Sequence, residues 1–187
     1  MPAEKPCAIV YIDGLNLYRF IKSTYPGSQR IDISTLCGLL FPSVEIIEIK
    51  YFTALMKSLD GNPDANIRQR NYLTELASRD SRILIQFGHV RIDTRVFPKA
   101  PKQVGEDGKF TTARVYKFEE KETDVRIACT MTADVAQAQA NRYYLISGDT
   151  DFKPLIEMVR ERFDADANQI SMHSISRKVV IQSQLGL

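Results

Sequence analysis

Two aspartates stand one residue apart at Asp149 and Asp151, directly after a strongly apolar run that ends in Ser147 and Gly148. Two carboxylates held this close repel each other unless a cation, a proton or a helix N-terminus relieves the repulsion. In open parallel α/β sheets, ligands bind at the carboxyl ends of the strands. The pattern therefore favours a divalent metal at the end of a buried strand, where Gly148 allows a sharp turn.

Two further acids occupy comparable places. Asp13 follows the apolar run Cys7–Ile12, and Asp124 opens a predicted helix three residues after Lys121. Hard cations such as Mg²⁺ take oxygen ligands and keep several waters, so a few carboxylates suffice to bind one. Such a metal lowers the pKa of a bound water and stabilises charge on phosphoryl oxygens. The four aspartates therefore predict metal-assisted hydrolysis of a phosphodiester.

Each of these residues also has an ordinary structural explanation. Asp149 suits a helix cap, Asp13 suits a tight turn, and Asp124 suits a first helical turn, where acids offset the helix dipole. Asn16 is either a polar ligand for substrate or metal or a turn residue. Lys121 neutralises the acids, contacts phosphate, or is a solvated surface lysine. Turn and cap roles do not require acids at several strand ends, so a shared site is the favoured hypothesis.

The elements that would position these acids alternate along the chain. Short apolar runs typical of buried strands are followed by stretches with helical spacing, which predicts an α/β fold with a central, mainly parallel sheet of about five strands. In a doubly wound sheet the first and fourth strands are neighbours, so the acids that follow them converge. Asp32 is a predicted N-cap, and Ile67, Leu73 and Leu76 form a predicted buried stripe. The expected strands cover residues 7–12, 44–55, 82–87, 143–146 and 169–174.

Residues 88–119 differ from the rest of the chain. Residues 90–97 and 113–118 alternate apolar and polar side chains around a segment rich in Pro, Lys and Gly, which predicts an inserted β-hairpin with a mobile loop. Its basic residues are interleaved with aromatic ones, a combination that holds single-stranded nucleic acid through phosphate charge and base stacking. A solvated hairpin explains the same residues. The candidate substrate contacts here are Arg95, Arg114 and Lys117.

At 187 residues the chain has the size of one domain, expected to span residues 1–187 with a core at about 7–175. Apolar residues make up 44% and charged residues 26%, the balance of a globular protein. The net charge of +2 is too small to indicate nucleic acid by itself. Three widely spaced cysteines, no apolar leader and no run of membrane-spanning length predict a cytoplasmic protein without a membrane partner.

Three blocks in order resemble the signature of the NYN domain family, specifically its LabA-like branch: Tyr11-Ile-Asp-Gly-Leu-Asn16, Lys121-Glu-Thr-Asp124 and Ser147-Gly-Asp-Thr-Asp-Phe152. The resemblance covers roughly residues 7–175. It implies a PIN-like three-layer α/β/α fold with Mg²⁺- or Mn²⁺-dependent ribonuclease chemistry. Carried onto this sequence, it implies an acidic metal cluster with two close polar neighbours: Asp13, Asp124, Asp149 and Asp151, with Asn16 and Ser147.

One departure from the family pattern concerns the helix after the second block. Many relatives place a further Asp two turns into it, where this chain has Thr130. Asp134 lies a turn further on, and this spacing predicts that its side chain points to a different place. The departure favours weaker metal binding or an inactive site.

The function predicted from these patterns is a metal-dependent endoribonuclease. The four aspartates would bind one or two Mg²⁺ or Mn²⁺ ions, and Asn16 would orient water or a phosphate oxygen. Ser147 and Lys121 are expected substrate contacts, like the basic residues of the hairpin. The expected partner is single-stranded RNA, with a homodimer also admitted. Two alternatives stay open: a non-catalytic RNA-binding adaptor with the same fold, and a phosphatase acting on small phosphate esters.

Overall fold

The computed structural model describes residues 5–27, 30–57, 62–101, 103–105, 107–162 and 170–174, the last segment by its backbone alone. Within these residues, five parallel strands form the central sheet in the order β3-β2-β1-β6-β7. Their bounds are β1 Cys7–Asp13, β2 Glu45–Thr53, β3 Ile83–Phe87, β6 Arg142–Ser147 and β7 Ile170–Ser174. The parallel pairing of all neighbours confirms the predicted α/β class and the number of strands.

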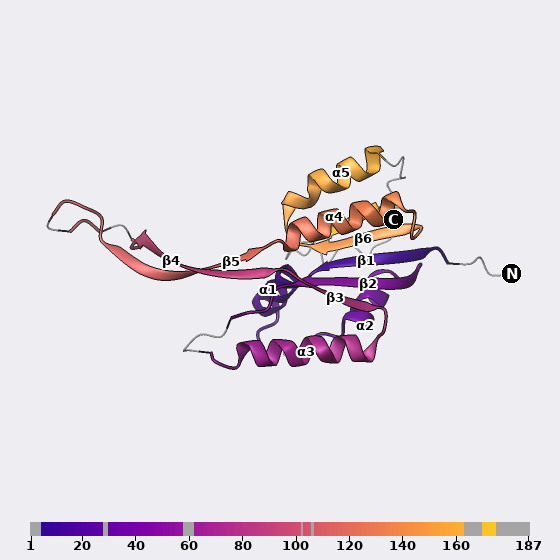
Figure 1. Ribbon diagram of the computed structural model, residues 1–187, viewed down its shortest axis with the longest axis horizontal. Coiled ribbons are helices and arrows are strands. Elements are labelled where there is room, and N and C mark those ends of the chain that lie inside the picture. The colour runs from indigo at the N-terminus through magenta and orange to yellow at the C-terminus, as the bar shows by residue number, and fades with distance from the viewer. Residues whose placement is uncertain are drawn as a thin grey trace.

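Helices cover both faces of this sheet and complete the three layers (Figure 1). α4 and α5 lie on one face, and α1, α2 and α3 lie on the other. β1 contributes side chains to the core on both faces of the sheet. Ile9 and Tyr11 pack toward α4 and α5, and Val10 and Ile12 pack toward the helices on the opposite face. Burial on both faces explains the continuous apolar run of this strand. The helices are α1 Gly14–Thr24, α2 Ile33–Leu40, α3 Ala65–Arg79, α4 Thr123–Ala136 and α5 Lys153–Arg162.

The predicted N-cap of α2 is confirmed, and the predicted buried stripe of α3 is partly wrong. Asp32 caps α2 by accepting the N–H of Thr35 at 3.0 Å, as predicted. Leu73 and Leu76 are buried, but Ile67 is 57% exposed. At about 100° per residue, Ile67 lies about 120° around the helix from Leu73. It therefore belongs to the outer side of α3.

The predicted insertion is an antiparallel hairpin of two long strands, β4 His89–Pro98 and β5 Thr112–Lys121. It forms a sheet of its own and does not join the central one. Figure 1 shows it projecting away from the body, with its base beside the start of α4. The hairpin is thus confirmed, and its base lies at the carboxyl-terminal edge of the central sheet.

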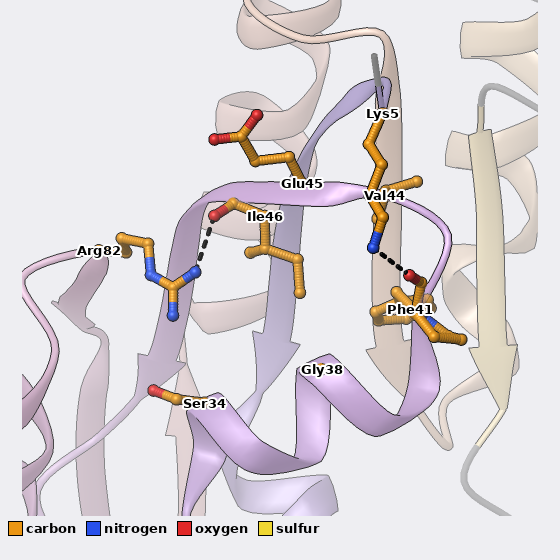
Figure 2. Close-up of a pocket in the computed structure, with 9 residues that line it drawn as sticks. Lys5, Ser34, Gly38, Phe41, Val44, Glu45, Ile46 and Arg82 are labelled. Atoms are coloured by element: carbon orange, nitrogen blue, oxygen red, sulfur yellow. Dashed lines mark hydrogen bonds between the residues drawn. The ribbon is translucent and has the colours of Figure 1, made fainter. Parts of the chain in front are cut away.

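A hollow of about 510 Å³ opens at the amino-terminal edge of the sheet (Figure 2). Lys5 and Arg82 line it, but both already donate to backbone carbonyls. Lys5 Nζ donates to Pro42 at 2.9 Å, and the Arg82 guanidinium donates to Ile46 at 3.0 Å. The aspartates of the sequence motifs follow the carboxyl ends of the strands, so this hollow is not the predicted site.

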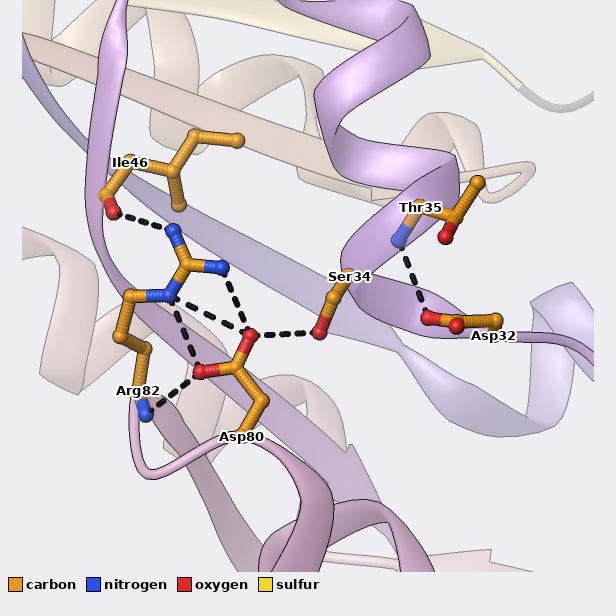
Figure 3. A network of polar contacts seen from close by, with 6 residues as sticks. All are labelled: Asp32, Ser34, Thr35, Ile46, Asp80 and Arg82. Atoms are coloured by element: carbon orange, nitrogen blue, oxygen red, sulfur yellow. Dashed lines mark hydrogen bonds and ion pairs between the residues drawn. The ribbon is translucent and has the colours of Figure 1, made fainter.

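Beside this hollow, Asp80 ties the turn before β3 to α2 and β2 (Figure 3). Arg82 donates to both of its carboxylate oxygens at 2.7 to 3.2 Å, and the Ser34 hydroxyl donates to Oδ2 at 2.5 Å. The same guanidinium also reaches the Ile46 carbonyl. Hydrogen bonds from Arg82 and Ser34 hold the pKa of Asp80 well below its usual range.

We expect Asp80→Asn to lower the free energy of unfolding at neutral pH by about 1–3 kcal/mol, because hydrogen bonds to a charged group are weakened. The folded pKa of Asp80 lies below its ordinary value of 3.8. Its stabilisation is therefore present above that value and is lost as the pH falls toward the folded pKa. Urea unfolding at neutral and acidic pH measures the difference, with the exposed Glu161→Gln as control. A difference that does not shrink on acidification would contradict this interpretation.

Candidate functional site

The two strands that precede the acid-bearing turns, β1 and β6, are neighbours in the sheet. Ile12 pairs with Ile146, so the turns after both strands open side by side. Asp13 ends β1 and is only 2% exposed. The hydroxyl of the fully buried Ser147 donates to its Oδ2 at 2.9 Å. The predicted adjacency of the two strand ends is therefore confirmed.

Asn16 completes the surroundings of the Asp13 carboxylate. Its backbone N–H donates to Oδ1 at 3.1 Å, and its side-chain amide donates to Oδ2 at 2.5 Å. Asp13 thereby caps α1. Gly14 lets the start of α1 lie close against β2, because a Cβ at this position would lie 2.7 Å from the carbonyl oxygen of Phe52. Asp13 thus fills the cap role and still presents a carboxylate at the edge of the sheet.

The same linkage continues into the turn after β6. Ser147 Oγ accepts the N–H of Asp149 at 3.1 Å, and Asp149 Oδ1 accepts the N–H of Asp151 at 3.0 Å. Asp149 thereby caps the short 3₁₀ helix η1 (Thr150–Phe152), which leads into α5. Asp149 is half-buried and Asp151 is exposed. A continuous series of hydrogen bonds therefore connects the acid of β1 to both acids after β6.

Asp124 stands in the first turn of α4 and is influenced by the other three acids. Partial burial raises the pKa of Asp124, and the negative charges of Asp13, Asp149 and Asp151 raise it further. Among the described residues, no ion pair engages any of these four carboxylates. The four acids therefore share one electrostatic environment that lacks a paired cation in the described part of the chain.

The donor chemistry of this cluster fits a hard divalent cation, which takes oxygen ligands. In the described part of the chain, however, no three Asp, Glu, His or Cys side chains are already grouped closely enough to hold one ion. Both oxygens of Asp13 accept hydrogen bonds, Oδ1 from the Asn16 N–H and Oδ2 from the Asn16 amide and the Ser147 hydroxyl. Residues of the right kind are thus present, and their carboxylates must turn toward a metal to bind it.

The sequence patterns missed Glu120, which joins the acids from β5. It is half-buried, and the Thr123 hydroxyl donates to its Oε1 at 2.6 Å. Burial raises the pKa of Glu120, and the negative charges of Asp13 and Asp124 raise it further. One signal for it existed in the sequence: Glu120 breaks the apolar alternation of this strand, directly before the second signature block.

Backbone geometry fixes the corner where β5 leads into α4. Glu122 has a φ of 73°, in the left-handed region that non-glycine residues seldom occupy. Gly88, at the start of the hairpin, approaches this corner closely, because a Cβ there would lie 2.7 Å from the carbonyl oxygen of Lys121. Such unfavourable conformations persist only where the surroundings hold them, and they cluster at functional sites. This corner sets where Glu120 and Asp124 stand.

Asp134 lies on α4 but not beside the acids. It is 5% exposed, and its Oδ2 accepts from Lys50 Nζ at 2.6 Å and from the Tyr11 hydroxyl at 2.5 Å. Asp134 is about 15 Å further along the helix than Asp124. It therefore serves the core and does not replace the acid that relatives carry at the position of Thr130.

The basic residues of the hairpin divide between its two faces. Residues directly opposite each other in β4 and β5 share a face. The register pairs Arg95 with Val115 but Val96 with Arg114. Arg95 and Arg114 therefore lie on opposite faces, since neighbouring positions along a strand alternate. The candidate substrate contacts Arg95 and Arg114 therefore do not share one surface of the hairpin.

Ion pairs gather on one face, which we call the charged face. Lys117 and Lys121 both pair with Glu119, Lys121 at 2.9 Å, and Arg95 pairs with Asp93 at 3.3 Å. Hydrogen bonds and charge from the two lysines lower the pKa of Glu119 to about 2. Lys121 is thus a surface lysine of the hairpin, and not a neutralising partner of the aspartates. The charged residues of this face are Arg91, Asp93, Arg95, Lys117, Glu119 and Lys121, and Val115 lies on it opposite Arg95.

The cysteines Cys7, Cys37 and Cys129 are free thiols. Burial raises the pKa of Cys37 to about 12, which keeps that thiol unreactive near neutral pH. In the residues that the structure describes, no helix is both long and apolar enough to cross a bilayer. A cytoplasmic location stays a prediction.

Comparison with known proteins gives a family match, a similar sequence and a similar solved structure. The model of the NYN domain matches residues 8–180. The 6-hydroxy-3-succinoylpyridine 3-monooxygenase HspA of Pseudomonas putida is 29% identical over 176 residues, which cover 83% of this chain and 56% of that protein. The chain thus spans little more than half the length of that relative. The crystal structure of a Vibrio parahaemolyticus protein of unknown function superposes with a TM-score of 0.58 and covers 93% of this chain and 84% of that one. At 16% sequence identity, this similarity is evidence for the fold alone.

Proposed function

Because this chain belongs to the NYN domain family, whose members are nuclease-like proteins, we propose that it is a metal-dependent endoribonuclease. The observation that carries the proposal is the group of aspartates at one edge of the sheet, where partial burial and then the charges of the other three raise the pKa of Asp124. The LabA-like branch stays a prediction. The activity in the name of the Pseudomonas relative belongs to a protein nearly twice as long as the matched region.

Four carboxylates would hold one or two Mg²⁺ or Mn²⁺ ions, directly or through water: Asp13, Asp124, Asp149 and Asp151. When bound, such a metal acts as a Lewis acid toward phosphoryl oxygens and lowers the pKa of a bound water. Three helices begin beside these acids, at Gly14, Thr123 and Thr150. Their N-terminal dipole ends favour the negative charge of an incoming phosphate.

Asn16 and Ser147 hold the Asp13 carboxylate before substrate arrives. Preorganised donors reduce the rearrangement needed at the moment of reaction. The half-buried amide of Asn16 then orients water or a phosphate oxygen. The aspartates act as ligands and not as nucleophiles, so water attacks phosphorus in line and no aspartyl-phosphate forms.

The charged face of the hairpin is the proposed contact for the RNA backbone. Its four basic residues outnumber its two acids, so it keeps an excess of positive charge despite its ion pairs. Neutralisation of phosphates by such residues supplies most of the non-specific affinity for nucleic acid. Arg114 points away from this surface and is not part of the contact.

Reversing two charges on this face should weaken RNA binding and its salt dependence together. For Arg95→Glu with Lys117→Glu, we expect the slope of log affinity against log salt to fall by about 1.4, since each phosphate contact on a single strand contributes about 0.7. Fluorescence anisotropy of a single-stranded RNA over a salt series measures the slope. Arg68→Glu with Arg70→Glu in α3 makes the same charge change elsewhere and is the control. An equal fall in the slope for both double variants would mean that net charge, and not the charged face, causes the effect.

A second candidate function is that of a non-catalytic RNA-binding adaptor. Two observations favour it: Thr130 stands where many relatives carry an acid, and in the described part of the chain no three acids are grouped closely enough to hold one metal ion. Circular single-stranded RNA separates it from an endonuclease, because an exonuclease or a binding protein leaves a circle intact. We expect Mn²⁺-dependent linearisation that EDTA abolishes. Normal RNA binding that leaves both the circle and a linear RNA of the same sequence intact would establish the adaptor. Linearisation that persists in EDTA would contradict the metal-dependent mechanism.

A further inference from the structure

The face of the hairpin opposite the charged face, which we call the apolar face, has a different chemistry. The register places Ile92 opposite Phe118 and Thr94 opposite Tyr116 on this face. Val96 follows toward the tip, opposite Arg114. Among the described residues of the hairpin, the four ion pairs all join residues of the charged face. The hairpin is thus amphipathic, although it stands apart from the core.

Large side chains of the apolar face are exposed to water. Tyr116 is 65% exposed, Val96 58% and Phe118 38%. Figure 1 shows the hairpin extending away from the helices of the body, so along most of its length the sheet has two strands only. A two-stranded sheet is marginal in water unless its apolar face packs on something. Exposed apolar patches of this kind mark interaction surfaces.

The two charges on the apolar face suggest which partner covers it. Glu120 stands at the base of the hairpin and Arg114 stands near the tip, with the Ile92–Phe118 and Thr94–Tyr116 pairs between them. When a second copy is laid on this face head to tail, each Arg114 comes beside the Glu120 of the other copy. The Ile92–Phe118 pair then meets the Thr94–Tyr116 pair of that copy. Such self-complementarity is what a two-fold interface requires.

We propose that two copies of this chain pair through the apolar faces of their hairpins in this head-to-tail arrangement. RNA is the less suitable occupant, since Arg114 is the one basic residue among the described positions of this face from Val90 to Pro98 and from Thr112 to Glu120. In the pair, both charged faces stay open to solvent. Glu120 stands among the acids of the site, so each Arg114 lies at the border of the other copy's site. This last consequence rests on the proposed nuclease function, whereas the pairing does not.

Neighbouring residues on opposite faces provide a matched test of the pairing. Sedimentation of the full chain, without RNA or metal, should show a dimer. Tyr116→Glu should raise the dissociation constant by about 100-fold or more, as loss of a central aromatic contact does in each of two copies. Val115→Glu, on the charged face and 41% exposed, should leave the dimer intact. A parent chain that is monomeric, or two variants that dissociate equally, would overturn the proposal.

Charge exchange tests the head-to-tail arrangement. Arg114→Glu and Glu120→Arg should each weaken the dimer, because each places like charges together in both halves of the interface. The double variant restores opposite charges and should recover the dimer. Circular dichroism checks that each variant folds. Failure of the folded double variant to recover would overturn this arrangement, and since the readout is association alone, the result is independent of whether the protein cleaves RNA.

Discussion

Asp149→Asn should reduce Mn²⁺-dependent RNA cleavage by about 100-fold or more while leaving the fold as stable as before or more stable. Asparagine caps a helix about as well as aspartate, so the hydrogen bond to the Asp151 N–H is kept. The substitution removes one negative charge from the group around Asp124 and so relieves repulsion. Single-turnover cleavage and thermal unfolding without metal measure the two effects.

Asp32→Asn is the matched control for this substitution. Asp32 caps α2 through a hydrogen bond to a backbone N–H at 3.0 Å, the same distance as in the Asp149 cap, but stands away from the acids. We expect Asp32→Asn to leave cleavage unchanged. If Asp149→Asn behaves like Asp32→Asn, Asp149 is a cap and nothing more. The catalytic proposal then fails at this residue.

Asp134→Ala should lower the free energy of unfolding by about 3–5 kcal/mol, because it leaves a buried cation without its partner. Lys50 and Asp134 side chains are only 9% and 7% exposed, and their charged atoms lie 2.6 Å apart. The Tyr11 hydroxyl donates to the same oxygen, and its pKa is raised by burial and by Asp134. Urea unfolding at neutral pH measures the loss. Glu48, 3.2 Å from Lys50 and 26% exposed, compensates only in part.

Replacing both partners distinguishes an unpaired charge from lost packing. Lys50→Met with Asp134→Leu removes the pair together and should recover most of the stability, as buried ion pairs exchanged for apolar residues often do. If Asp134→Ala lowers the free energy of unfolding by less than about 1 kcal/mol, the Lys50–Asp134 pair contributes no more than an exposed salt bridge does. Cleavage by the folded double variant should be retained, since Asp134 lies about 15 Å along α4 from Asp124.

The sequence was sufficient to predict the strands, their parallel order at the centre and the edge at which the acids stand. Continuous apolar runs identify strands buried on both faces, and β1 is such a strand. A turn bearing an acid after each of two neighbouring strands is enough to predict that the two strand ends lie side by side, whereas Ser147 as a neighbour of Asp13 came from the resemblance to the NYN family. Asp32 was found by the same local logic, because a cap depends on residues close in the chain.

Features that depend on register or on distant partners could not be read from the sequence. Which hairpin residues share a face depends on how β4 and β5 align, and a loop of more than ten residues leaves this open. The sequence alone therefore does not show that Arg95 and Arg114 lie on opposite faces. Glu120 reaches the acids only because of the backbone corner at Glu122. The bond between Asp134 and Lys50 joins residues 84 positions apart and has no local signal.

The central claim is that the aspartates at the ends of β1 and β6 share a metal ion with Asp124. Crystals soaked in Mn²⁺ test it most directly, because anomalous scattering locates the ion without assumption about its ligands. We predict a peak at about 2.0–2.6 Å from carboxylate oxygens of at least two of the four aspartates, or bridged to them by water. A fully occupied Mn²⁺ elsewhere on the protein, with none among Asp13, Asp124, Asp149 and Asp151, would contradict it.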